Sequence, residues 1–140
     1  MITFQLISAS GIKFDGQAYE VLVPTRDGTI ALFEDHMPLV SAGAPGLVSI
    51  RKKAEDSDSS MESFAVGGGI IQIDGKTARF ISDDITTSDD ASEQEAEAAM
   101  ERAQELLKRA GSQIEINEAK RLMAHSSAKL HVAKIKKRRH

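Results

Sequence analysis

The 140-residue chain contains no cysteine and no tryptophan, and only three of its residues are proline. Without cysteine it can form neither a disulfide framework nor a cysteine-ligated zinc site. Aromatic residues make up 4% of the sequence, so we expect a core of Ile, Leu, Val and Ala with five Phe at most. The N-terminal residues lack the pattern of a signal peptide, and no apolar run is long enough to span a membrane. We therefore expect a cytosolic protein that reaches a membrane only through its partners.

The net charge of −3 conceals a difference between two parts of the chain. Residues 1–90 contain 7 Lys and Arg against 14 Asp and Glu, which gives −7. Residues 91–140 contain 11 Lys and Arg against 7 Asp and Glu, which gives +4. A split of this kind predicts two units with different partners.

Short apolar runs separated by turn residues fill the first part of the chain. The other runs are arranged around residues 21–50, where Pro24, Gly28 and the pair Pro45-Gly46 are expected to mark turns. A polar loop at residues 52–60 then predicts a hairpin. Many short strands at near-regular spacing indicate a β-sandwich or barrel rather than a parallel sheet.

Two glycine signals fall near the end of this strand-rich part. Residues 67–69 are all glycine, and we expect them to interrupt a strand. Asp74-Gly75 predicts a tight hairpin whose return strand is residues 77–81. The glycines do not form a phosphate-binding loop, because a strand follows them and not a helix.

The composition changes near residue 89, and two helices are predicted after it. Residues 91–110 contain neither Gly nor Pro, Asp90 and Glu93 fit a capping box, and Gly111 follows as a C-cap. A second helix is predicted from about residue 114 to about residue 134. Each helix has a stripe of small and apolar residues, which are Ala96, Ala99, Ala103, Leu106 and Ala110 in the first and Ile116, Ala119, Met123, Ser126, Leu130 and Ala133 in the second. We expect an antiparallel hairpin that buries little apolar area and can detach from the strand-rich part.

The order and spacing of these motifs resemble one known family. The pieces are the turn Pro24-Thr25-x-x-Gly28, His36-x-Pro38-Leu39, Pro45-Gly46, the phrase FAVGGG at residues 64–69, the strand at 77–81 and the final helical pair. Together they resemble the epsilon subunit of a bacterial F-type ATP synthase. The resemblance covers nearly the whole chain.

The resemblance implies a β + α fold. Residues 1–88 would form a β-sandwich of about ten strands that binds the gamma subunit and the c-subunit ring. Residues 89–140 would form a C-terminal antiparallel two-helix hairpin with a regulatory role. A protein of this family is a rotor subunit of the central stalk without catalytic residues of its own, held peripherally on the cytoplasmic side of the bacterial plasma membrane.

The resemblance also assigns contact residues. The loop that faces the c ring and gamma would contain Gly28, Thr29, Glu34, Asp35 and His36, although the family's acidic position after the glycine is Thr29 here. When the helices extend along gamma toward the catalytic alpha and beta subunits, they would inhibit ATP hydrolysis. The basic tail would then meet an acidic surface through Lys134, Lys136, Lys137, Arg138 and Arg139.

A nucleotide-sensing module is the alternative function. Some members of the family bind ATP on the helical hairpin through Ile or Leu, then Asp, two variable residues, Arg and Ala. Aligned on Arg102-Ala103, this chain has Ala98 and Ala99 at the first two positions, so the Asp is missing. Arg102, Arg109 and Arg121 are the remaining candidates to contact ATP as a regulatory ligand.

Other charged clusters have simpler explanations than ligand binding. Asp56, Asp58 and Ser60 follow the start of a calcium loop but lack its later Gly and Glu, and the acidic residues 83–90 fit a polar linker. We predict no resident metal. A third hypothesis is that the basic tail binds nucleic acid or anionic lipid. The acidic chain lacks an aromatic stacking face, so we do not expect nucleic acid as a partner.

Overall fold

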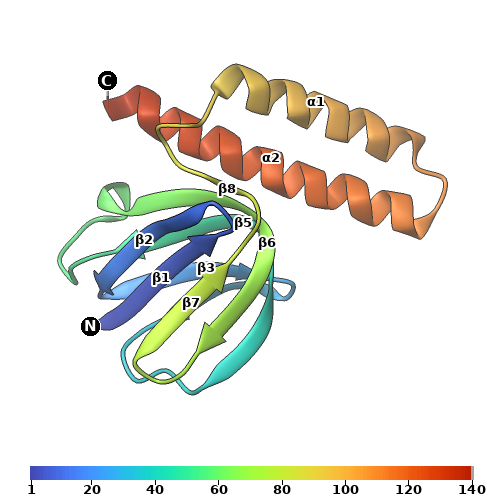
Figure 1. Ribbon diagram of the computed structural model, residues 1–140. Helices are drawn as coiled ribbons and strands as arrows, with labels where there is room; N and C mark the ends of the chain where they lie inside the picture. The colour runs from blue at the N-terminus through green and yellow to red at the C-terminus, as the bar shows by residue number, and fades with distance from the viewer. Residues whose placement is uncertain (140) are drawn as a thin grey trace.

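The computed structural model describes residues 1–139, and it describes side chains as far as residue 135. The first part of the chain is strand-rich, and two helices follow it (Figure 1). The elements are β1 (Ile2–Ser8), β2 (Gly11–Ala18), β3 (Glu20–Thr25), β4 (Gly28–Leu32), β5 (Leu39–Arg51), the short 3-10 helix η1 (Asp58–Ser60), β6 (Glu62–Ile73), β7 (Thr77–Ile81), β8 (Ile85–Thr86), α1 (Glu93–Arg109) and α2 (Gln113–Arg139).

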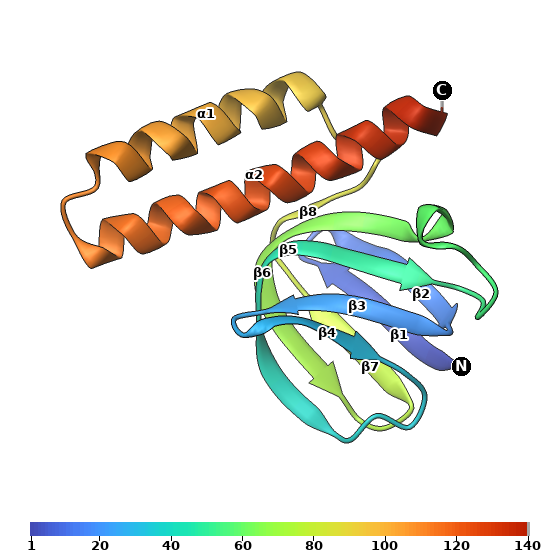
Figure 2. The same cartoon turned by 180° about the vertical axis from the view of Figure 1, so that it is seen from behind.

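The eight strands form one sheet in the order β2-β1-β7-β6-β5-β3-β4, and β8 pairs with β6. This sheet makes a sandwich because β5 and β6 are long, with 13 and 12 residues, and bend together (Figure 2). The half of β6 before the bend pairs with β8, and the half after it pairs with β7. The predicted β-sandwich followed by a helical hairpin is therefore confirmed.

The strands number eight in the structure, whereas the resemblance led us to expect about ten. The predicted turn at Pro45-Gly46 and the predicted break at residues 67–69 both lie inside continuous strands, opposite each other in register. They bend β5 and β6 without ending them. Each of these two strands contributes a segment to both layers, which accounts for the difference in number.

The core lies between the two layers and follows the alternation of inward-facing positions. β1 shows it most clearly, because Ile2, Phe4 and Leu6 are fully buried and the residues between them are half-buried. Phe80 of β7 and Ile71 of β6 are buried beside them. The expected composition of the core, aliphatic with a few Phe, is confirmed by the structure.

The strand β6 needs glycine where it passes the end of β7. A Cβ atom placed on Gly69 would overlap the carbonyl oxygen of Ile81. Phe80 also lies close, with its Cε1 atom 3.1 Å from that Cβ position. Because backbone atoms cannot move aside as the end of a flexible side chain can, the bend requires a residue without a side chain here.

The helix α1 begins slightly later than predicted, and the helix α2 ends later than predicted. The N-cap of α1 is Ser92 and not Asp90, and its Oγ accepts a hydrogen bond from the backbone N–H of Glu95 at 3.2 Å. Asp90 instead accepts a hydrogen bond from Thr87 Oγ1 at 2.8 Å. The helix α2 extends to Arg139, beyond the predicted end near residue 134, because no Gly or Pro interrupts the basic segment.

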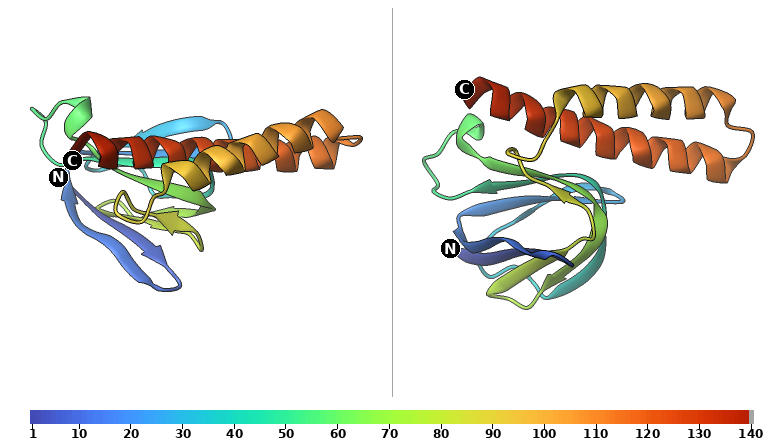
Figure 3. Two further views of the ribbon diagram at one scale, coloured as in Figure 1. Left: turned by 90° about the horizontal axis from the view of Figure 1, so that it is seen from above. Right: turned by 45° about the horizontal axis from the view of Figure 1, so that its top comes forward.

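The helices pack as the predicted antiparallel hairpin, with α2 between α1 and the sandwich (Figure 3). Ala96 and Ala103 of α1 are buried, and so are Ala119, Ser126 and Ala133 of α2. One member of the predicted stripe does not belong to it, because Leu106 is 53% exposed. The closed end of the hairpin extends beyond the edge of the sandwich (Figure 1).

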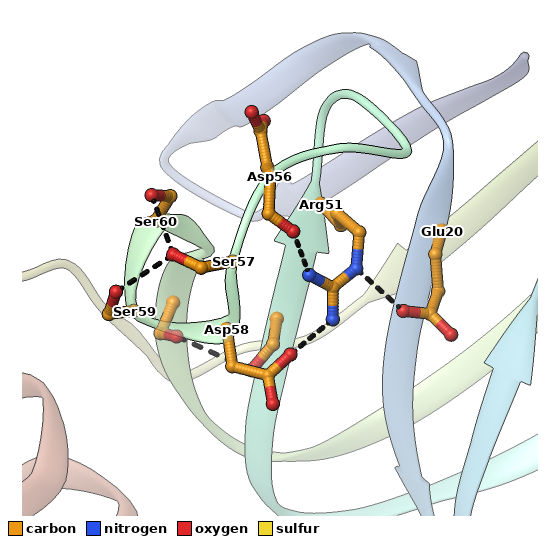
Figure 4. Close-up of polar contacts among 9 residues, drawn as sticks. Glu20, Arg51, Asp56, Ser57, Asp58, Ser59 and Ser60 are labelled. Atoms are coloured by element: carbon orange, nitrogen blue, oxygen red, sulfur yellow. Dashed lines mark hydrogen bonds and ion pairs between the residues drawn. The ribbon is translucent and has the colours of Figure 1, made fainter.

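At the C-terminal end of β5, Arg51 holds the polar loop 52–60 against β3 (Figure 4). Its Nε atom donates to Glu20 Oε1 at 3.1 Å, and its other nitrogens donate to the carbonyl oxygen of Asp56 and to the Asp58 carboxylate. Hydrogen bonds with Asp58 first and Glu20 second raise the pKa of Arg51. The loop therefore contacts an arginine through the Asp56 carbonyl oxygen and the Asp58 carboxylate.

We predict that Gly69→Ala destabilises the sandwich by about 2 kcal/mol or more, because the new methyl group overlaps backbone atoms. Urea-induced unfolding followed by circular dichroism measures the change. Gly16→Ala is the matched control, since a Cβ there meets only Phe14 ring atoms at 3.6 and 3.7 Å. Equal stability of the two variants would contradict this account of the bend.

Candidate functional site

The contact between α2 and the sandwich is small and made mainly of small side chains. Ala128 and Val132 of α2 are buried against Ala65 of β6, and Leu47 and Ala91 pack at the edge. This cluster is much smaller than the sandwich core, and most of its members contribute only a methyl group. The free energy that holds the hairpin on the sandwich is therefore modest compared with the free energy that holds the sandwich together.

A histidine lies in the middle of this contact. The side chain of His125 on α2 is 13% exposed, and its Nε2 atom is buried without a hydrogen-bond partner. The nearest carboxylate oxygen is Oδ2 of Asp84, at 3.6 Å, on the segment between β7 and β8. Burial lowers the pKa of His125, the positive charge of Lys129 lowers it further, and Asp84 only partly opposes them.

Gly67 of β6 lies directly beneath His125 of α2. A Cβ atom placed on Gly67 would lie 3.2 Å from His125 Cε1 and 3.1 Å from Asp84 Cβ. The N–H group of Gly67 donates to the Asp84 carbonyl oxygen at 2.9 Å. Three segments that are far apart in the sequence thus meet at one glycine. Sequence reasoning missed His125, because a lone histidine on a helix gives no signal of what it packs against.

The structure divides the predicted contact loop into two separate places. Gly28 and Thr29 begin β4 and lie beside α2, where they share a shallow hollow with His131. Glu34, Asp35 and His36 follow the other end of β4. Because β4 has five extended residues, its two ends lie roughly 16 Å apart. The five predicted contact residues therefore do not form one continuous contact surface.

Within the second group the backbone makes a tight corner. Asp35 has a positive φ of 61°, and His36 Nδ1 lies 2.8 Å from the carbonyl oxygen of Met37. The neighbouring side chains of Phe33 and Met37 are exposed, the latter at 79%. This corner, residues 33–37, presents two carboxylates beside exposed apolar side chains. We call it the acidic corner.

The three arginines proposed to contact ATP do not converge. Arg102 and Arg109 share a groove on the outer face of α1, where Arg109 also pairs with Glu105 at 3.7 Å. Arg121 lies on α2 and lines a different cavity of about 650 Å³ between that helix and the sandwich.

The cavity at Arg121 is basic. Arg26 of the β3–β4 turn and Lys120 of α2 line it as well, together with Asn117, and none of the described acidic residues does. The sequence did not indicate this grouping, because Arg26 and Lys120 are almost a hundred residues apart. The arrangement attracts anions to this edge of the contact.

The predicted basic contacts lie on the last turns of α2. Lys134 is exposed on the helix. The side chains of Lys136, Lys137, Arg138 and Arg139 lie outside the described residues, although the backbone there is helical. Among the described residues there is no group of His, Asp and Glu that could hold a metal ion, and no helix is long and apolar enough to cross a bilayer.

The molecule is thus a bent β-sandwich on which a helical hairpin rests through a small buried contact, and its notable features are contact surfaces. Residues 1–88 match the family described as the beta-sandwich domain of the ATP synthase delta/epsilon chain. The chain belongs to this family.

Curated relatives agree with the match. The chain is 31% identical over 129 residues to the ATP synthase epsilon chain of Delftia acidovorans, covering 92% of this chain and 91% of the relative. It is 30% identical to the epsilon chain of Verminephrobacter eiseniae, with the same coverage. The predicted resemblance to epsilon subunits is therefore confirmed, and it includes the helical hairpin.

Solved structures share the fold at much lower identity. A chain of the Euglena gracilis mitochondrial ATP synthase, from a structure of its OSCP, F1 and c-ring, has a TM-score of 0.72 at 11% identity, over 91% of this chain and 78% of that one. A chain from the central stalk and c-ring of the Tetrahymena thermophila mitochondrial enzyme has a TM-score of 0.50 at 16% identity, over 63% and 67%. At these identities the likeness concerns the fold.

We predict that Val132→Ala weakens the contact between hairpin and sandwich by about 2 kcal/mol, because a fully buried side chain loses two carbon atoms. Hydrogen exchange of the α2 amides should become about an order of magnitude faster or more, while exchange in β1 stays unchanged. Val40→Ala is the control, because Val40 is 74% exposed. Faster exchange in β1 and α2 together would indicate a single cooperative unit instead.

Proposed function

We propose that this protein is a rotor subunit of the central stalk of a bacterial F-type ATP synthase and couples gamma to the c ring. The observation that carries the proposal is its membership of the family, together with epsilon-chain relatives that match over nine-tenths of its length. The assemblies that contain its structural neighbours include a c-ring and a central stalk, which supports the same partners here. In this role it has no catalytic residue and acts through its surfaces.

The sandwich and the hairpin divide the work in this proposal. Residues 1–88 bind gamma and the c ring, and residues 89–140 regulate. The acidic corner at residues 33–37 is the better candidate for the c ring, because its exposed carboxylates and apolar side chains lie far from the hairpin. The protein would sit peripherally on the cytoplasmic side of the bacterial plasma membrane.

Inhibition of ATP hydrolysis by the extended helices is the second part of the proposal. The small apolar contact between α2 and the sandwich supports it, because little area has to be exposed for the hairpin to leave. The exposed Lys134 and the basic residues after it would then approach acidic surfaces of the alpha and beta subunits. Such contacts weaken as salt screens them.

The nucleotide-sensing alternative receives less support from the geometry. Arg102 and Arg109 line one groove and Arg121 lines another, on a different helix. The sequence also lacks the Asp of the family's ATP motif, which is Ala99 here. We therefore keep ATP as a regulatory ligand outside the proposed function.

We predict that the full chain inhibits ATP hydrolysis by a gamma-containing catalytic head, and that residues 1–90 alone still bind gamma without inhibiting. The reason is that the sandwich core lies before residue 88, whereas the proposed brake lies in the helices. Steady-state hydrolysis and copurification with gamma measure the two properties. Circular dichroism must show that the truncated chain is folded.

A full-length variant makes the same test without truncation. Replacing Lys134, Lys136, Lys137, Arg138 and Arg139 with Gln should reduce inhibition several-fold and flatten its dependence on salt. Undiminished inhibition by this variant would remove the basic tail from the mechanism. Loss of gamma binding by the truncated chain would overturn the division of labour between sandwich and hairpin.

For the c ring, we predict that Asp35→Lys lowers ATP-driven proton pumping by the assembled enzyme at least several-fold, while gamma binding is retained. The reversed charge disturbs the acidic corner without touching the core, since Asp35 is exposed. Glu55→Lys, a change of the same charge on the exposed loop 52–60, is the control. Equal pumping by both variants would place the ring contact elsewhere.

A further inference from the structure

We propose that His125, seated on Gly67 beside Asp84, is a proton-operated latch that releases the hairpin from the sandwich when it becomes charged. The release is a property of the isolated chain, so it goes beyond the proposed function and does not depend on inhibition. It rests on the packing of three segments at one point of the contact: α2, β6 and the segment between β7 and β8.

The neutral imidazole fits this position and the charged one does not. The Nε2 atom is buried without a hydrogen-bond partner, and Asp84 Oδ2 is beyond hydrogen-bond distance at 3.6 Å. Protonation of both ring nitrogens would therefore create a buried charge that is attracted by a carboxylate but not bonded to it. A buried charge of this kind costs more free energy than a buried neutral ring.

The charged groups around the His125 ring come from α2 and from the segment between β7 and β8. Asp84 approaches from the segment between β7 and β8 and favours the imidazolium. Lys129 lies one turn further along α2 and disfavours it, and Arg121, one turn earlier on α2, adds positive charge with its guanidinium over Gly68. The strand β6 contributes only the glycine at this point.

The sign of the pH dependence follows from these contacts. When the hairpin leaves, water surrounds the ring and its pKa returns to about 6.5. In the docked state burial and Lys129 hold the pKa of His125 below that value. The docked state therefore binds fewer protons than the released state. The contribution of the neutral His125 ring to docking is complete above about pH 6.5, and it is lost as the pH falls toward the lowered pKa. Acid releases the hairpin.

Gly67 makes the latch possible because it lets the ring reach the strand. With the helix docked, a methyl group on this residue would press against both His125 and Asp84. The strand itself can accept alanine, since the position is extended backbone within β6. A substitution here should affect docking of the helix much more than folding of the sandwich.

Energy transfer between two dyes tests the latch in the intact chain, which has no cysteine of its own. Lys76→Cys on the β6–β7 turn and Gln104→Cys on α1 provide exposed attachment sites on the two parts. We expect transfer to fall between pH 8 and pH 5.5, with the docking equilibrium changing by at most about tenfold per pH unit. Far-UV circular dichroism at each pH checks that the sheet is intact.

Four variants in the same labelled background decide the outcome. His125→Gln should abolish the response to pH, while the matched control His131→Gln, an exposed histidine of the same helix, should keep it. Asp84→Asn should make acid release more complete, because the carboxylate that partly compensates the charge is gone. Gly67→Ala should show low transfer at both pH values.

An unchanged response to acid in His125→Gln would overturn the proposal. So would constant transfer in the parent chain, or a rise on acidification, which would mean that Asp84 locks the charged ring in place. Because no catalytic head or gamma subunit is present in this experiment, its failure leaves the proposed rotor function untouched. Failure of the hydrolysis experiments likewise leaves the latch untouched.

Discussion

A steric constraint at the bend of β6 underlies the whole structure. Gly69 passes so close to the backbone of Ile81 that no side chain fits, and this contact lets one sheet turn into two layers around a core. Two residues earlier, Gly67 leaves the space in which α2 rests. Residues 67–69 therefore pack against the end of β7 through Gly69 and against α2 through Gly67.

The two parts of the molecule differ in what holds them. The sandwich buries large side chains such as Phe4, Phe80 and Ile71 completely. The hairpin is held by alanines and a serine within itself, and by a cluster of three buried residues against the sandwich. Since hydrophobic stabilisation grows with buried apolar area, the hairpin is the part whose position can change while the sandwich persists.

Charge follows the same division. The strand-rich part is acidic, and the helical part is basic toward its end. Where they meet, the charges are few and incompletely compensated, as at His125 and Asp84 and in the basic cavity at Arg121. In the role that we propose, the helices exchange one contact surface for another, and small changes in charge can shift the balance between the two.

Much of the architecture could be predicted from the sequence because it depends on neighbours in the chain. The short strands of the first part, the Asp74-Gly75 hairpin and the two helices with their small-residue stripes are local signals, and the structure has them. Local reasoning erred where distant residues decide. Pro45-Gly46 reads as a turn by itself, yet pairing with β6 keeps it inside a strand.

The sequence by itself therefore determined the class of fold, the order of its elements and the family. Only the tertiary structure decided which residues meet. It separated Thr29 from Asp35, sent Arg121 to a different cavity from Arg102, and brought His125 onto Gly67 beside Asp84. The physical reason is that secondary structure follows from periodicity and turn chemistry over a few residues, whereas a contact depends on how long strands bend and where a helix can approach them.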